Sequence, residues 1–267
     1  MSDMPFGNRR IEIGKMLRNA MFAYGILTNS EVWHSITEKH IEDLQVMDIM
    51  LLKYITGAHA KVQSEFLYLE TGVIPLKQII SSRRLMYLKN ILNKTSGELV
   101  KRVYEEQKVK QVKGDWTELV KRDIKEFELN MDENAIANIS KSEYTHIVKT
   151  KIKENVFARR RFKQEEHYKI RKIVYSDLKT QGYLKSHMMN NHEVSLLFSI
   201  RSRTTKQFKA NFPYNVNQLC PMGCSDEDTP EHCLVCNQLR NEETQSLDVT
   251  YEELFSKDIA RQALLSS

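Results

Sequence analysis

Glycine and proline are scarce in this sequence: only nine glycines and five prolines occur among 267 residues. All-β sandwiches and barrels need more turn residues than this, so the shortage favours helices. Apolar residues make up 41% of the chain and charged residues 28%, which is typical of a globular protein rather than a disordered one. We therefore predict a mainly α fold.

The sequence also lacks long hydrophobic runs and a targeting segment. No apolar run approaches the roughly 20 residues that cross a bilayer. Residues 1–16 are polar and charged, unlike a secretory signal peptide. We expect a soluble intracellular protein, nuclear or cytoplasmic, with no membrane partner.

Familiar catalytic motifs are missing as well. There is no Gly-rich phosphate loop and no G-x-S-x-G, and no two aspartates are adjacent, as they commonly are in two-metal polymerase centres. All four cysteines lie within residues 220–236, so none is left to act as a nucleophile elsewhere. We expect no enzymatic activity and no small-molecule substrate.

Apolar residues at helical spacing indicate a series of helices. The clearest covers residues 38–56, where Leu44, Met47, Leu51 and Ile55 form one face and Gly57 follows as a C-terminal cap. Pro75 marks the start of another helix within residues 68–92. Further helix starts are predicted from the pairs Thr95–Glu98, Asp115–Glu118 and Ser140–Glu143. The last of these helices is expected to extend toward Tyr175.

The chain divides into four regions by pattern. Residues 1–130 are expected to form a helical bundle, and residues 131–200 a long basic helical region. Residues 201–240 are expected to hold a basic lead-in and a small zinc-stabilised module. Residues 241–267 are a short tail with one weak helix.

The cysteine window has the spacing Cys220-x3-Cys224-x7-His232-x3-Cys236. Three thiolates and an imidazole suit tetrahedral Zn²⁺, and with all four positions filled by protein the ion would be structural. Cys233, next to His232, is a possible competing ligand, but we expect it to pack as a small apolar residue. The alternative is a loop of unligated cysteines, although clustered cysteines in a reducing compartment are more often ligands.

Two basic segments are candidates for nucleic-acid binding. Residues 149–172 hold ten bases against three acids, with aromatic residues interleaved, and residues 201–209 hold four bases and no acid. Such a helix face can follow a phosphate backbone and offer rings for stacking. The alternative is a solvated helix face. The predicted contacts are Lys149, Lys153, Arg159, Arg160, Arg161, Lys163, Arg171, Lys172, Arg201, Arg203, Lys206 and Lys209.

Three stretches together resemble one family. They are "LRNAMFAYGILTNSEVW" (17–33), "YLETGVIPLKQIISSRRLMYLKNIL" (68–92) and "RSRTTKQFKANFPYNVNQLCPMGCSDEDTPEHCLVC" (201–236). In content and order they resemble the region after the palm in reverse transcriptases of LINE-type (non-LTR) retrotransposons. The chain differs in having three residues between its first two cysteines, where many relatives have two.

The resemblance implies a C-terminal fragment of such a reverse transcriptase. Residues 15–57 would be the thumb, connector helices would follow, and Cys220, Cys224, His232 and Cys236 would hold the zinc of the module. The catalytic palm and the endonuclease of the family match nothing in this chain. Its partners would be RNA, DNA and the missing palm.

Two hypotheses of function follow. The first is a non-catalytic, nucleic-acid-binding region that contacts the RNA template or the DNA backbone. The second is a helical scaffold that docks to a polymerase palm or another protein, with zinc serving stability only. Large exposed apolar patches in the first 90 residues would favour the scaffold.

Overall fold

A computed structural model describes residues 10–34, 36–167, 173–185 and 189–204, together with Leu219, Cys220, Gly223 and His232. Within these residues the regular elements are helices, and none is a β-strand. The predicted mainly α fold is confirmed. None of the helices in the described part combines the length and the apolar character needed to cross a membrane.

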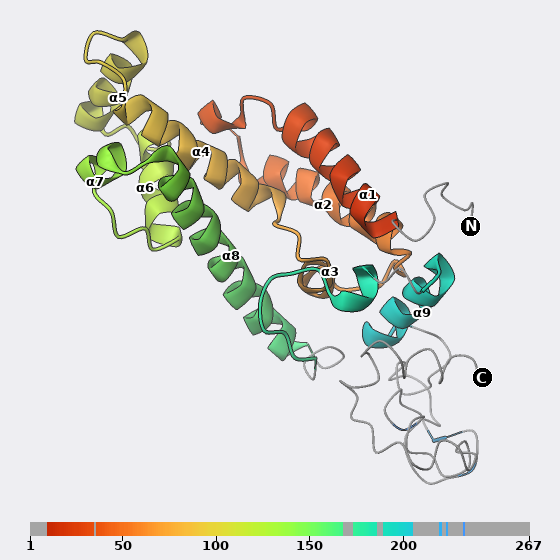
Figure 1. The fold of residues 1–267 in the computed structure, drawn as a ribbon. Coiled ribbons are helices and arrows are strands. Elements are labelled where there is room, and N and C mark those ends of the chain that lie inside the picture. Colours follow the sequence, from red (N-terminus) through yellow and green to blue (C-terminus); the bar gives the residue numbers. More distant parts are fainter. Residues whose placement is uncertain are drawn as a thin grey trace.

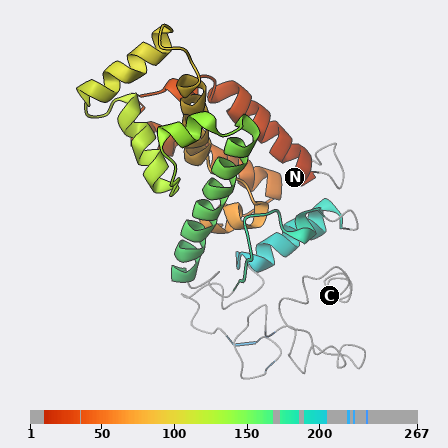
Figure 2. The ribbon, with the colours of Figure 1, turned by 60° about the vertical axis from the view of Figure 1, so that its left-hand side comes forward.

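Two groups of shorter helices lie near the opposite ends of the long helix α8 (Figure 1). Figures 1 and 2 show α5, α6 and α7 gathered around the start of α8, whereas α3 and α9 lie nearer its other end. The elements are α1 (Arg10–Arg18), the π-helical η2 (Asn19–Ile26), η3 (Ser30–Val32), α2 (Glu38–Thr56), α3 (Ser64–Thr71), α4 (Leu76–Leu92), α5 (Leu99–Lys110), α6 (Trp116–Glu126), α7 (Glu133–Asn138), α8 (Lys141–Glu166), η4 (Gly182–Lys185) and α9 (Asn191–Arg201).

Short polar side chains set the ends of several helices, as predicted. The helix expected over 38–56 is α2, and it ends at Gly57, which has a φ of 66°. Asp115 accepts a hydrogen bond from the backbone amide of Glu118 at 2.8 Å, and Ser140 accepts one from Glu143 at 3.1 Å. These bonds satisfy amides that have no partner inside the helix.

Helix α8 ends at Glu166, before the expected Tyr175. The side-chain amide of Gln164 donates to the carbonyl oxygen of Ile173 at 2.7 Å, and Arg161 donates to the same oxygen at 2.9 Å. These bonds hold the following segment back against the last turn of α8. The helical pattern therefore stops because side chains of α8 bind the chain that leaves it.

One hydrophobic core joins the helices from Ile11 to Phe198. On α8 every fourth residue enters it, and all four are at most 2% exposed: Tyr144, Val148, Ile152 and Val156. The described parts of regions 1–130 and 131–200 thus share this core, which makes α8 an integral part of the bundle, and Phe22, Leu27, Leu76 and Ile80 form a second, smaller cluster.

Three buried ion pairs connect segments that are distant in sequence. They are Arg18–Asp48, Arg84–Asp123 and Arg201–Glu70. Buried charges are tolerated only when they are paired and hydrogen-bonded. Each of these pairs is joined by hydrogen bonds, but Oε2 of Glu70 and Nε of Arg84 have no partner among the described residues. Asp48, for example, also accepts from the Tyr68 hydroxyl at 3.2 Å, and Asp123 accepts from Ser81 at 3.0 Å.

Candidate nucleic-acid interface

The charges of α8 are segregated around its axis. With 3.6 residues per turn, five basic residues lie within about 120° of one another on an ideal helix. We call these residues the basic side of α8: Lys149, Lys153, Arg159, Arg160 and Lys163. Three of the four acids of α8, Glu143, Glu154 and Glu165, fall within about 40° of one another on the other side, and Glu166 lies in line with Arg159 at the end of the helix. One side of the helix therefore carries the positive potential.

Ion pairs strengthen this separation. Glu154 pairs with Lys151 at 3.6 Å and Glu165 with Arg161 at 3.1 Å, so two acids of α8 are matched by bases outside the basic side. Lys149, Lys153 and Lys163 are exposed, and none forms an ion pair with another described residue. These three lysines are therefore available to a polyanion.

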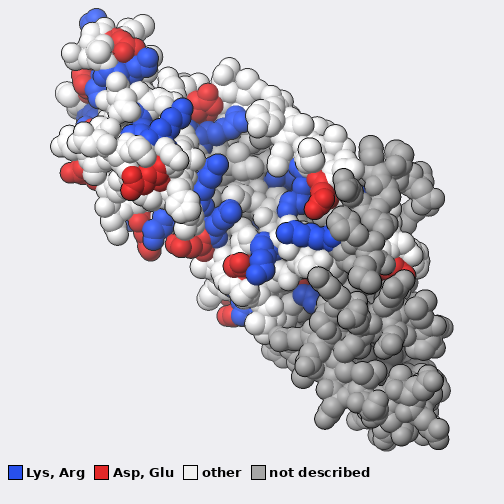
Figure 3. Space-filling model, in the orientation of Figure 1, with Lys and Arg blue, Asp and Glu red and all other residues white. Residues whose placement is uncertain are grey.

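A groove of about 420 Å³ lies where the second half of α8 meets the start of α4. We call it the α4–α8 groove. Its cations are Arg159, Arg160 and Lys163 of α8 and Lys77 of α4. Figure 3 shows Lys and Arg side chains gathered in the middle of the face on which α8 lies. The structure thus brings three predicted contacts together and adds Lys77, which the sequence did not indicate.

Carboxylates bind some of the groove cations without neutralising all of them. Arg160 pairs with Glu65 at 3.0 Å, Arg159 with Glu126 at 2.9 Å and Lys77 with Glu38 at 3.0 Å, whereas Lys163 has no ion pair with another described residue. Burial alone would raise the pKa of the Glu65 carboxyl. Hydrogen bonds from its own amide and Ser64, with the charges of Arg160 and Lys163, instead hold that pKa below its ordinary value. Glu65 is therefore ionised at neutral pH and fixes Arg160 against the Tyr68 ring, 4.5 Å from its centroid.

Arg201 takes a different place from the one we expected. It is 8% exposed, and its guanidinium donates to the Glu70 carboxylate at 2.7 and 3.0 Å. A charge held in the core is not presented to a phosphate, which is the physical reason to remove Arg201 from the interface. Arg161 is half-buried and bound to Ile173 and Glu165, and Arg203 is half-buried. Arg171, Lys172, Lys206 and Lys209 lie outside the described residues.

Two of the four predicted zinc ligands are described. Cys220 is 6% and His232 is 8% exposed. The amide of Gly223, which has a φ of 85° and lies in a bend, donates to the Cys220 carbonyl oxygen at 3.1 Å. Cys224 and Cys236 lie outside the described residues, and among those described no three His, Cys, Asp or Glu side chains form a metal-binding group. A buried thiol and a buried imidazole are compatible with a closed zinc site.

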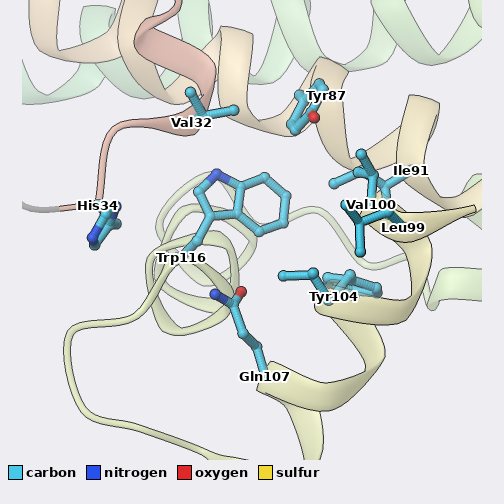
Figure 4. A pocket seen from close by; sticks show the side chains of 10 residues that line it. Val32, His34, Tyr87, Ile91, Leu99, Val100, Tyr104, Gln107 and Trp116 are labelled. Atoms are coloured by element: carbon cyan, nitrogen blue, oxygen red, sulfur yellow. The ribbon is translucent and has the colours of Figure 1, made fainter.

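An apolar pocket of about 320 Å³ surrounds Trp116, between η3, α4, α5 and α6. Figure 4 shows the indole among Val32, Tyr87 and Val100, with His34 apart at one edge. The Trp116 ring meets Tyr87 and Tyr104 edge to face, at 5.8 and 6.0 Å between centroids. The pocket lacks convergent polar groups, so it suits an apolar side chain better than chemistry.

Further apolar side chains are exposed on α1, η2 and α2. Helix α1 packs directly against α2, because Gly14 leaves room for Ile55. Each helix nevertheless leaves large side chains in solvent, with exposed fractions between 52% and 80%: Met16, Met21, Tyr24, Val46, Met47, Met50 and Tyr54. Several exposed methionines in one region are typical of adaptable protein-binding surfaces.

Comparison of the chain with protein-family models, with curated proteins and with solved structures gives no match. The likeness to retrotransposon reverse transcriptases therefore rests on the three sequence stretches alone. The function has to be argued from the side chains of the interface.

Proposed function

We propose that this chain is a non-catalytic nucleic-acid-binding region, similar to the C-terminal part of a LINE-type reverse transcriptase. It contacts the RNA template or the DNA backbone through the basic side of α8. The observation that carries the proposal is the segregation of charge on this helix. Glu143, Glu154 and Glu165 face away, and the last two are paired, whereas Lys149, Lys153 and Lys163 are exposed.

The dimensions of the basic side suit a polyanion. From Lys149 to Lys163 the helix rises about 21 Å at 1.5 Å per residue. That length corresponds to about six base-pair steps of 3.4 Å. Binding through Lys and Arg to phosphate is largely independent of sequence and weakens steeply with salt, because it releases condensed counterions.

Replacing Lys149, Lys153 and Lys163 together by glutamine tests the interface. If all three contact phosphates, the slope of log K against log salt for single-stranded RNA falls by about 2. The affinity at 0.1 M salt then falls by about 10- to 100-fold. Fluorescence anisotropy titrations at several salt concentrations measure both quantities.

The matched control removes the same charge elsewhere. Lys110, Lys113 and Lys121 are exposed on or near α5 and α6, and their joint replacement by glutamine should leave the slope nearly unchanged. Equal effects of the two triple variants would show that only net charge matters, and the interface on α8 would then be rejected.

We also propose that Cys220, Cys224, His232 and Cys236 hold one structural Zn²⁺. The buried Cys220 and His232 and the bend at Gly223 support this assignment. The ion would link segments that have little core of their own, so that metal binding supplies folding free energy there. The four side chains would bind and orient the ion and leave no position open for water.

Elemental analysis of purified protein should find one zinc per chain, and Cys220→Ser should release it. Helix content by circular dichroism should change little, because the core from Ile11 to Phe198 contains none of the four ligands. Ser202→Ala is a control outside the ligand set. Purified wild-type protein without stoichiometric zinc would refute the assignment.

A second candidate function is the helical scaffold. The exposed apolar side chains of α1, η2 and α2 favour it, as does the pocket at Trp116. Its partner would be a polymerase palm or another protein with a complementary apolar surface. The RNA titration separates the two functions: a pure scaffold shows no binding whose salt slope depends on Lys149, Lys153 and Lys163.

A further inference from the structure

The α4–α8 groove contains a buried polar atom with no partner. Gln78, in the first turn of α4, is 8% exposed, and its side-chain carbonyl oxygen makes no hydrogen bond. Leaving a buried acceptor unpaired lowers stability, so such groups in native proteins call for an explanation. Gln78 lines the groove, so its side-chain amide lies next to any ligand bound there.

The start of α4 offers a place for an anion beside Gln78. Pro75 is its N-cap and contributes no side-chain cap, and the first turn holds no acid. In contrast, α2 and α8 are capped by Thr37 and Ser140. Uncapped amides and the helix dipole favour a phosphate at such an end. Lys163 adds positive charge around it, as does Lys77, which also pairs with Glu38 at 3.0 Å.

The groove also has an exposed aromatic ring. Phe162 of α8 lines the groove and is 65% exposed. Val156 and Pro75 extend the apolar lining to both elements. A volume of about 420 Å³ lies within the range of about 300–1,000 Å³ that is typical of small-molecule sites.

We propose that the α4–α8 groove binds one unpaired nucleobase of a single-stranded nucleic acid together with its phosphate. The base stacks on Phe162, its edge bonds to the side-chain amide of Gln78, and the phosphate lies at the start of α4 near Lys77 and Lys163. This inference rests on the proposed function and specifies its ligand as single-stranded.

The chemistry of the groove predicts selectivity for single strands over duplexes and tolerance of any base sequence. A base inside a duplex has both faces stacked and its pairing edge occupied, so it cannot enter without being flipped out. An amide offers one acceptor and two donors, so it can bond to the edge of any base. Stacking on an aromatic ring is likewise tolerant of sequence. The site should therefore distinguish single strands from duplexes rather than one sequence from another.

Three probes of about 12 nucleotides, within the span of a single-strand site, test the inference by anisotropy with the full chain. They are a single-stranded RNA, the same backbone with abasic residues, and a duplex. Wild-type protein should bind the base-bearing single strand about fivefold or more tightly than the abasic strand. Phe162→Ala and Gln78→Met should each narrow this difference, whereas affinity for the abasic strand stays constant.

Tyr24→Ala is the matched control, because Tyr24 is an 80% exposed aromatic residue that does not line the groove. It should leave all three affinities unchanged. Both groove variants should fold, since Phe162 is on the surface and Gln78→Met removes an unpaired polar atom.

Equal affinity for base-bearing and abasic strands, with a salt slope that still depends on the α8 lysines, would overturn the inference and leave the proposed function intact. Duplex binding as tight as single-strand binding would overturn it too. Absence of binding to every probe would overturn both proposals.

Discussion

Replacing Arg201 by methionine is expected to lower the free energy of unfolding by about 3–5 kcal/mol, because it leaves a buried carboxylate without its counter-charge. Glu70 is 0% exposed and accepts two hydrogen bonds from Arg201. The Tyr175 hydroxyl also donates to this carboxylate, at 2.6 Å. Urea unfolding at neutral pH, followed by circular dichroism, measures the change.

Tyr175 cannot compensate for the lost arginine. Burial and the neighbouring Glu70 carboxylate raise the pKa of Tyr175 well above its ordinary value, so its hydroxyl stays a neutral donor. Burial would lower the pKa of Arg201, but Glu70 more than offsets this and the net shift is upward. The buried charges of Glu70 and Arg201 therefore depend on each other, and removing one leaves the other unfavourable in the core.

The double variant Glu70→Gln/Arg201→Met separates pairing from packing. It removes both charges, so its loss of stability should be far smaller than the sum of the two single losses. Additive losses would contradict a coupled pair. Lys153→Met, an exposed lysine on α8, is the control for loss of positive charge and should change stability by at most about 0.5 kcal/mol.

The same experiment decides between two roles for Arg201. The sequence placed it among phosphate contacts because basic residues surround it, and the structure buries it against Glu70. Sequence pattern could not anticipate this, because the two residues are 131 positions apart. If Arg201→Met binds RNA as wild type does under conditions where it is folded, the structural role accounts for the residue.

Helices were predictable where the signal is local. The 3.6-residue period of apolar residues and the polar caps at Asp115 and Ser140 depend on neighbours within one turn. The end of α8 was not predictable, because Gln164 there binds the carbonyl oxygen of Ile173, which lies beyond the last turn of the helix. Local sequence specifies how a helix starts, and tertiary contacts determine where this one stops.

The candidate site likewise has one part that could be predicted from the sequence and another that could not. Charge segregation on α8 follows from its own sequence, so Lys149, Lys153 and Lys163 were predicted together. The α4–α8 groove could not be predicted in this way, because nothing in the local sequence around Lys77 and Gln78 indicates that they meet α8. Only the packing of α4 against α8 brings these residues together.

Gly72→Ala should be as damaging as the loss of Arg201, by a different mechanism. Gly72 ends α3 with a φ of 62°, and a Cβ atom there would lie 2.5 Å from the backbone nitrogen of Thr180 and 2.6 Å from the Cα of Lys179. Left-handed backbone costs alanine about 1–2 kcal/mol, and overpacking adds about 1–3 kcal/mol. We expect a loss of about 2–5 kcal/mol in the free energy of unfolding, measured in urea.

The segment opposite Gly72 cannot simply move away. Gln181 donates its amide to the Glu70 carbonyl oxygen at 2.9 Å, and the Thr180 hydroxyl donates to the Thr71 carbonyl oxygen at 2.9 Å. Lys15 of α1 donates to the Thr180 hydroxyl oxygen at 2.5 Å. A shift of residues 179–181 would break these bonds, which tie α1 and α3 to the segment before α9.

Gly114→Ala is the matched control for Gly72→Ala. Gly114 has a φ of 81° and nothing within 4 Å of the added carbon, so it shares the backbone strain without the close approach. Its replacement should cost only about 1 kcal/mol. Similar losses at the two positions would mean that the conformation of Gly72 matters and its contact with residues 179–180 does not.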